Sequence, residues 1–362
     1  MTTIMPHPAL DPPLLTPDLP GVGGRIKVRP EDFEVEEVPS YEPSGEGDHL
    51  YLWVEKRDVG PEFLARTIAQ RLGTHAGAVG TAGLKDRHAV TRQWVSVPKE
   101  VEPRLKHVDG DGIRVLKVSR HNNKLKPGHL RGNTFRLLVR GADATKADAL
   151  ATILDRVKTQ GMPNYYGPQR FGRDGGTVDL GFKCLAGTQP KRLRPFVYKF
   201  ALSAVQSLLF NDYLGRRVTD GLFRTVLSGD VMMKWPFGGL FVAEDVPAEQ
   251  ARFDARETVT GGPMFGSRTF ATAGPAAERE AVILRDHKLS PAAFAGFGKL
   301  MGGTRRHNLV YLDDLTAAWD PDGLRLAFTL PSGCYATILL REVMKANPDD
   351  ATGAEEEGGE EE

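Results

Sequence analysis

The last folded segment of the chain is too short to form a hydrophobic core of its own. Residues 309–346 predict two short strands and one helix, with Ile338, Leu339 and Val343 on the apolar face of that helix. Segments of under about 40 residues rarely fold alone without disulfides or metals, and the only cysteines are Cys184 and Cys334. The segment must therefore pack against an earlier part of the chain, which predicts a discontinuous domain.

The sequence pattern of the rest of the chain changes at Gly161. Residues 24–161 predict strands at 25–38, 49–56, 92–97, 113–119 and 133–139, and helices at 61–71 and 143–160. Beyond Gly161 the chain is rich in glycine and proline turns, and its strongest element is a helix near 195–215. We expect one domain of residues 24–161 and 309–346 with residues 162–308 inserted. Residues 1–23 contain six prolines without periodicity and predict a disordered leader.

The formal net charge of zero hides a strong asymmetry. Residues 349–362 carry eight acidic and no basic residues, which predicts a disordered tail over 347–362. Without those eight acids, the chain has 47 basic and 39 acidic residues. Residues 114–140 contain eight Lys or Arg and no acid. This pattern favours a polyanion, above all nucleic acid, as partner; a solvated basic face is the alternative.

Composition excludes several classes of protein. No stretch approaches the roughly 18 apolar residues of a membrane span, and the first residues lack the pattern of a secretory signal. Two cysteines cannot supply a disulfide framework. The nine histidines lack the helical pairing typical of metal sites, so we expect no metal. These features predict a cytoplasmic protein with no membrane partner.

One loop concentrates the residues that could do chemistry. The sequence GLKDRHAVTRQ at residues 83–93 places a single carboxylate, Asp86, among the basic side chains of Lys85, Arg87 and His88. Nearby cations stabilise an ionised carboxylate, which is the form that a carboxylate nucleophile needs. The same residues would equally suit a surface loop held by salt bridges, so this motif alone does not decide between the two readings.

Six segments appear together in a fixed order and resemble the TruD family of tRNA pseudouridine synthases. They span residues 26–342 and read IKVRPEDFEVEE, GLKDRHAVTRQ, GNTF, NYYGPQRFG, FALSAVQSLLFN and LPSGCYATILLRE. The resemblance implies an α+β fold: a discontinuous catalytic domain with a mixed, mainly antiparallel sheet and flanking helices, and a second, inserted α/β domain. It also implies isomerisation of uridine 13 in the dihydrouridine arm of tRNA, without a cofactor. We expect a monomer with no protein partner.

The resemblance also implies roles for particular residues. Asp86 matches the catalytic aspartate, Lys27 its basic partner, and Phe33, Asn133 and Tyr335 the residues that contact the substrate base. Many family members have Phe where Tyr335 stands, which leaves stacking intact but changes the pocket. The candidates for further RNA contact are Lys85, Arg87, His88, Lys124, Lys126, Arg131, Phe135, Tyr166, Arg170 and Phe171.

Two other functions remain open at this point. One is a non-catalytic module that binds RNA or assists tRNA folding, which would need the basic residues but not Asp86. The other is a carboxylate-based nucleoside hydrolase, for which the sequence offers no convincing second carboxylate.

Overall fold

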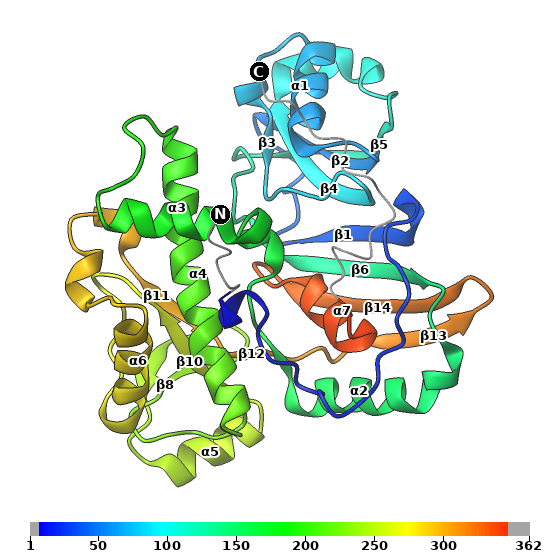
Figure 1. Cartoon of the computed structure of the whole chain (residues 1–362). Helices are drawn as coiled ribbons and strands as arrows, with labels where there is room; N and C mark the ends of the chain where they lie inside the picture. The colour runs from blue at the N-terminus through cyan, green and yellow to red at the C-terminus, as the bar shows by residue number, and fades with distance from the viewer. Residues whose placement is uncertain (1–6, 347–362) are drawn as a thin grey trace. The chain divides into compact units, whose positions relative to one another are not determined.

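The computed structural model describes residues 7–346, so the predicted acidic tail lies outside the described residues. The chain divides into two compact units, each built from separate segments (Figure 1). We call residues 19–158, 312–336 and 343–346 the large-sheet unit, and residues 7–18, 159–311 and 337–342 the helical unit. The predicted boundaries of the inserted domain, 162 and 308, stay a prediction.

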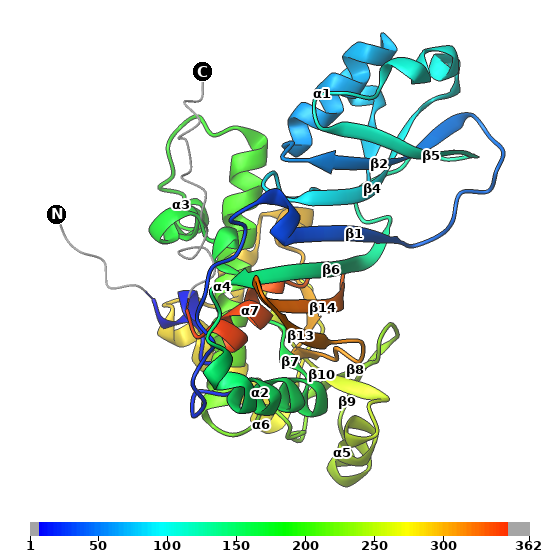
Figure 2. The same cartoon turned by 90° about the vertical axis from the view of Figure 1, so that its right-hand side faces the viewer.

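The large-sheet unit is built on an eight-stranded sheet, which can be followed in Figures 1 and 2. The strand order is β13-β14-β6-β1-β4-β2-β5, and β3 pairs with β4. Only β1 and β4 run parallel, so the sheet is mixed and mainly antiparallel, and the predicted α+β class is confirmed. The bounds are β1 Phe33–Pro39, β2 His49–Arg57, β3 Gly80–Thr81, β4 Val90–Pro98, β5 Ile113–His121, β6 Leu130–Arg140, β13 Thr316–Asp320 and β14 Gly323–Pro331.

Two helices of this region follow their sequence signals. Helix α1, Pro61–Leu72, begins with proline in its first turn and ends at Gly73, whose φ of 64° suits glycine. Its buried face, with Leu64 and Ile68, belongs to one core with Leu50 of β2 and the neighbouring apolar residues of β2 and β4. Helix α2, Ala147–Gln160, likewise buries one apolar face.

The helical unit packs its helices around α4, Pro195–Thr219, which confirms the helix predicted near 195–215. Helix α3, Gly176–Leu185, lies against α4 at Gly181, where an added Cβ would lie 2.2 Å from the Ala201 carbonyl oxygen. The other helices are α5 Val246–Asp254 and α6 Gly274–Asp286. The strands are β8 Val231–Lys234, β9 Leu240–Val242, β10 Thr258–Met264 and β11 Thr304–His307 in one antiparallel sheet, and β7 Met162–Pro163 with β12 Leu309–Val310.

The predicted disordered leader is wrong for residues 7–23. Residues 8–10 form a short 3₁₀ helix, and Ala9 enters the core of the helical unit. The buried Glu342 of helix α7, Ala336–Met344, accepts hydrogen bonds from the Leu15 amide, the Thr16 amide and the Thr16 hydroxyl. Long-range contacts, including those of Leu15 and Thr16 with one distant carboxylate, hold this proline-rich segment despite its lack of periodicity. None of the helices between residues 7 and 346 combines the length and apolar content needed to cross a bilayer.

Replacing Glu342 tests whether its hydrogen bonds to Leu15 and Thr16 tether the N-terminal segment to helix α7. Glu342→Ala removes the acceptor of three hydrogen bonds from Leu15 and Thr16, so we expect the free energy of unfolding to fall by about 3 kcal/mol. Thr16→Val, the matched control, removes one donor and should cost about 1 kcal/mol. Urea unfolding measures both variants, and a loss below about 0.5 kcal/mol for Glu342→Ala would contradict the tether.

Candidate active site

Asp86 lies in the loop between β3 and β4, with its side chain half exposed. The loop is anchored at both ends, because Ala82 and Ala89 are buried and their carbonyl groups accept hydrogen bonds from the Gly128 and Asp58 amides. Between these anchors the Asp86 side chain is 49% exposed. The loop therefore presents a carboxylate to solvent from a constrained backbone.

Lys27 is the cation that meets this carboxylate. Its Nζ donates a hydrogen bond to Asp86 Oδ1 at 3.2 Å and lies 4.4 Å from the centre of the Phe33 ring. The backbone of Lys27 has a φ of 53°, in the left-handed region that disfavours lysine. Such strain, about 1–3 kcal/mol, persists only where the surroundings impose it. Here the two residues before Lys27 are fixed. Ile26 is buried, and Arg25 exchanges two backbone hydrogen bonds with Arg140.

The ion pair itself contributes little to stability. The Lys27 side chain is only 18% exposed, but Asp86 is open to water, and half-exposed pairs are worth about 0–1 kcal/mol. A strained backbone that delivers an ammonium to an exposed carboxylate is typical of a functional site, where strain is retained for its chemical use.

Lys56 supports the same loop from inside and was missed by the sequence analysis. Its side chain is fully buried in β2, and its Nζ donates hydrogen bonds to the carbonyl oxygens of Val59 at 2.6 Å and Asp86 at 2.5 Å. Burial lowers the pKa of Lys56 to about 8. A signal was present in the strand pattern, since Leu50, Leu52, Val54 and Lys56 alternate on one buried face. A lysine at the end of an apolar row must be satisfied internally.

Lys85 is buried and meets a carboxylate rather than solvent, and its contact with RNA stays a prediction. Its Nζ lies 3.1 Å from Oε2 of Glu37, and the side chains are 4% and 0% exposed. Burial raises the pKa of Glu37, although the neighbouring Lys85 and the hydrogen bond from the Trp94 amide act in the opposite direction. The motif places four charged or polar residues in a row, but the loop turns Lys85 inward and Asp86 outward.

The two phenylalanines predicted to contact RNA are also buried. Phe135 is 7% exposed and stacks on Phe328 of β14, with ring centroids 5.3 Å apart. Phe171 is 2% exposed in the core of the helical unit. In this conformation both rings are covered by protein, and their contact with RNA stays a prediction.

The three residues predicted to contact the base lie in the same unit as Asp86. Asn133 of β6 pairs with Glu37 of β1 and with Leu330 of β14, and its buried side-chain oxygen has no hydrogen-bond partner among residues 7–346. Tyr335 lies in the turn between β14 and α7, immediately before α7, and is half-buried. Phe33 is 3% exposed, with the Lys27 ammonium over its ring. In this conformation Phe33 supports Lys27 and offers no free face to a base.

The remaining candidates differ in how freely they face solvent. Arg87, Lys126 and Arg131 are exposed. His88 lies 3.0 Å from a carboxylate oxygen of Asp58, and Lys124 donates to the Gly77 carbonyl oxygen. Their roles in RNA contact stay predictions.

In the helical unit, Tyr166 and Arg170 are brought together. The Arg170 guanidinium lies 5.8 Å from the Tyr166 ring centre and 4.9 Å from that of Phe200. Arg170 also donates to the hydroxyls of Ser203 and Ser207, at 2.7 and 3.2 Å. Their contact with RNA likewise stays a prediction.

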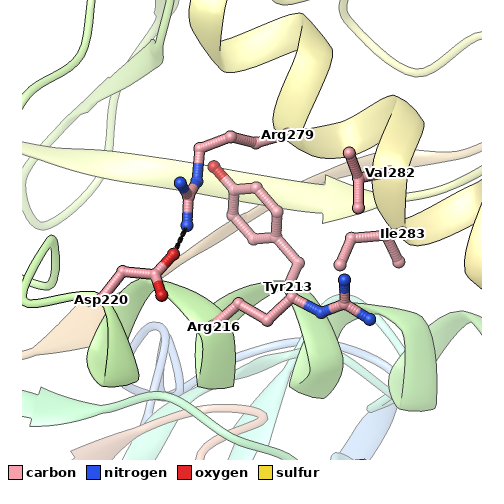
Figure 3. Close-up of a pocket in the computed structure, with 6 residues that line it drawn as sticks. All are labelled: Tyr213, Arg216, Asp220, Arg279, Val282 and Ile283. Carbon is pink, nitrogen blue, oxygen red and sulfur yellow. Dashed lines mark hydrogen bonds and ion pairs between the residues drawn. The ribbon is translucent and has the colours of Figure 1, made fainter.

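A pocket of about 290 Å³ lies away from these residues, in the helical unit between α4 and α6 (Figure 3). Its lining includes an ion pair between Arg279 and Asp220, which the figure shows closing one side. None of the predicted site residues lines it. This cavity is therefore separate from the loop that carries Asp86.

One cluster has the composition of a metal site. His7, Asp212 and His287 each offer a ligand atom within 4.8 Å of the others. Both oxygens of Asp212 already accept hydrogen bonds from Arg216, at 2.9 and 3.0 Å, and one also contacts His287 at 2.9 Å. A guanidinium on the carboxylate would oppose a cation there, so the cluster is satisfied as a hydrogen-bonded group.

The buried lysine yields a test by pH. Because the folded-state pKa of Lys56 is about 8 and the ordinary value is 10.5, the unfolded chain binds more protons between these pH values. Burial of the protonated Lys56 ammonium therefore lowers the unfolding free energy by its full amount below pH 8. This loss becomes smaller as the pH rises toward 10.5, because folding then favours the neutral amine. The unfolding free energy of the wild type should therefore rise relative to Lys56→Met by up to about 3 kcal/mol between pH 8 and 10.5.

Urea unfolding at pH 7.5, 9 and 10.5 measures this difference. The control is Lys106→Met, which makes the same substitution at an exposed lysine. A difference between the wild type and Lys56→Met that stays constant with pH would contradict the account of Lys56.

The comparisons with known proteins agree over nearly the whole chain. The family model described as tRNA pseudouridine synthase D (TruD) matches residues 10–188 and 190–343. The tRNA pseudouridine synthase D of Anaeromyxobacter sp. (strain Fw109-5) is 43% identical over 344 residues, covering 94% of this chain and 97% of the relative. That of Thermus thermophilus is 42% identical over 344 residues, covering 95% of each.

A solved structure supports the fold. The crystal structure described as a tRNA pseudouridine synthase D from Methanosarcina mazei matches with a TM-score of 0.78 and 24% identity, covering 96% of this chain and 99% of that one. The match of the family model and the identity to the bacterial relatives lead to one assignment: this chain belongs to the TruD family of tRNA pseudouridine synthases.

Proposed function

We propose that this protein converts uridine 13 in the dihydrouridine arm of tRNA to pseudouridine, with Asp86 as the catalytic residue and Lys27 as its partner. The substrate class follows the description of the relatives, which are tRNA pseudouridine synthases. The position in the tRNA follows the motif resemblance. The single observation that carries the proposal is the exposed Asp86 carboxylate, held 3.2 Å from the Lys27 ammonium.

The reaction needs little from the protein beyond a well-placed carboxylate. The bond between uracil N1 and ribose C1′ breaks, the base turns, and C5 forms a new bond to C1′. N1 gains a proton and C5 loses one, so the product is an isomer and no oxidant or group donor enters. Charge that develops at C1′ as the glycosidic bond breaks can be stabilised or trapped by an ionised carboxylate. Removal of a sugar proton by Asp86 is the alternative route, and both routes use the exposed carboxylate.

Lys27 has a defined part in either route. A hydrogen bond from an ammonium to a carboxylate is charge-assisted and directional. It leaves one Asp86 oxygen engaged, while the half-exposed side chain keeps the remainder of the carboxylate accessible. Lys56 meanwhile holds the backbone carbonyl of the same residue. The carboxylate is thereby oriented from the backbone side and from the side-chain side.

Asn133 offers recognition of the base. Its buried side-chain oxygen lacks a partner among the described residues, and such an atom costs free energy until a donor arrives. The N3–H group of uracil is a donor of this kind, and the Asn133 amide nitrogen can donate to a uracil carbonyl. Extrusion of the base from its stack, as in other enzymes that modify bases, would bring these groups together. Tyr335 supplies a half-buried ring in the same unit.

Part of the basic segment 114–140 is free to meet phosphates. Arg120, Arg136 and Arg140 pair with the carboxylates of Glu102, Glu36 and Asp32. The exposed members without a carboxylate partner among residues 7–346 are Arg114, Lys117, Lys126 and Arg131. Contacts of this kind position an RNA without reading its sequence.

Mapping the product tests the proposal. An unmodified tRNA transcript is incubated with the protein, and pseudouridine is located by carbodiimide modification and reverse transcription. We expect modification at position 13, and none in a matched transcript with cytidine there. Free uracil as product would indicate a hydrolase, and binding without any product would indicate a non-catalytic module. Either result would overturn the proposed reaction.

A further inference from the structure

An exposed aromatic ring stands at the start of α4 in the helical unit. Phe196 is 73% exposed, far more than a phenylalanine normally is in a folded protein. Its ring stacks on that of Phe200, one helical turn later, with centroids 5.9 Å apart and an angle of 9° between the planes. Since Phe200 supports one side, Phe196 presents an oriented ring to solvent.

The stack continues behind Phe200. The Arg170 guanidinium lies 4.9 Å from the Phe200 ring centre and is fixed by the hydroxyls of Ser203 and Ser207. Arg170 also lies 5.8 Å from the Tyr166 ring centre. This row of aromatic and cationic groups is therefore fixed at Arg170, and its other end is the exposed ring of Phe196. A supported ring loses little conformational entropy on binding, which favours it as a stacking platform.

Basic residues flank Phe196 in the sequence. Residues 180–211 contain no Asp or Glu. The cations on either side of Phe196 are Lys191, Arg192, Arg194 and Lys199; all four are exposed, and none has a carboxylate partner among residues 7–346. Unpaired cations beside an exposed ring are complementary to a nucleotide, which carries an anionic phosphate and a flat base.

We propose that Phe196 and the four cations that flank it in the sequence bind an unpaired nucleotide of the RNA substrate, with its base stacked on Phe196. This inference rests on the proposed function only in taking RNA as the substrate. Paired RNA is a poor fit, since its bases are already stacked on one another, whereas any unpaired base has a free face. One ring offers too little apolar area for a protein interface, which buries far more surface.

Binding of a fluorescently labelled, unmodified tRNA transcript tests the platform. Base–aromatic stacking is worth about 1–3 kcal/mol, so Phe196→Ala should weaken binding by roughly 5- to 150-fold. Phe196→Trp should restore it. The matched control is Phe237→Ala, which removes a 68% exposed ring from the same unit and should leave binding unchanged. Because the Phe196 ring is exposed, thermal unfolding of Phe196→Ala should match that of the wild type.

The salt dependence separates stacking from charge. Phe196→Ala should lower the affinity equally at all salt concentrations, whereas Arg194→Gln should reduce the slope of log affinity against log salt by about one. A photoreactive benzoylphenylalanine at position 196 should cross-link to a nucleotide in a loop of the transcript.

The outcomes distinguish this inference from the proposed function. If the wild type forms pseudouridine but Phe196→Ala binds tRNA as well as the wild type does, the platform is wrong and the proposed function stands. Cross-linking confined to a paired stem would also overturn it. A wild type that binds no tRNA would overturn both. Loss of binding to an acidic peptide, with tRNA binding unchanged, would assign the surface to a protein partner instead.

Discussion

The site depends on two hydrogen bonds by which two lysines fix the position of Asp86. Lys56 is buried in β2 and binds the Asp86 carbonyl oxygen, while Lys27 binds the carboxylate from a strained backbone. Both interactions carry a cost in free energy. The buried Lys56 ammonium loses its hydration, and the backbone of Lys27 is strained in the left-handed region. Together the two interactions orient an exposed carboxylate, and a single exposed salt bridge would leave that side chain free to rotate.

The sheet explains why residues far apart in sequence meet. Strand β1 follows Lys27, β2 carries Lys56, and β4 follows Asp86, and the three strands are neighbours in the order β1-β4-β2. On the other side of β1, strand β6 carries Asn133 opposite Glu37, whose carboxylate holds Lys85 next to Asp86. The parallel pairing of β1 with β4 is the feature that brings the first and third of these segments together.

The sequence predicted the scaffold better than the site. Hydrophobic periodicity was enough for α1, α2 and α4, and for most strands of the large sheet, because burial on one face leaves a regular pattern. Charge patterning did not show that Lys85 is buried, since a pattern does not say which way a loop side chain points. It also missed Lys56, although the alternation in β2 placed it on the buried face. Lys27 could be assigned only through the family resemblance, because its contact with Asp86 spans 59 residues. Residues 7–23 lacked periodicity and yet are ordered, because their partner Glu342 lies at the far end of the chain.

The central claim is that the Asp86 carboxylate performs the chemistry and does not merely hold RNA. The most direct measurement is tritium release from tRNA labelled at C5 of uridine, compared between the wild type and Asp86→Asn, with tRNA binding measured in parallel. The account predicts that Asp86→Asn binds tRNA within a few-fold of the wild type and releases tritium at least about 1,000-fold more slowly. Turnover by Asp86→Asn at a rate near that of the wild type would contradict it.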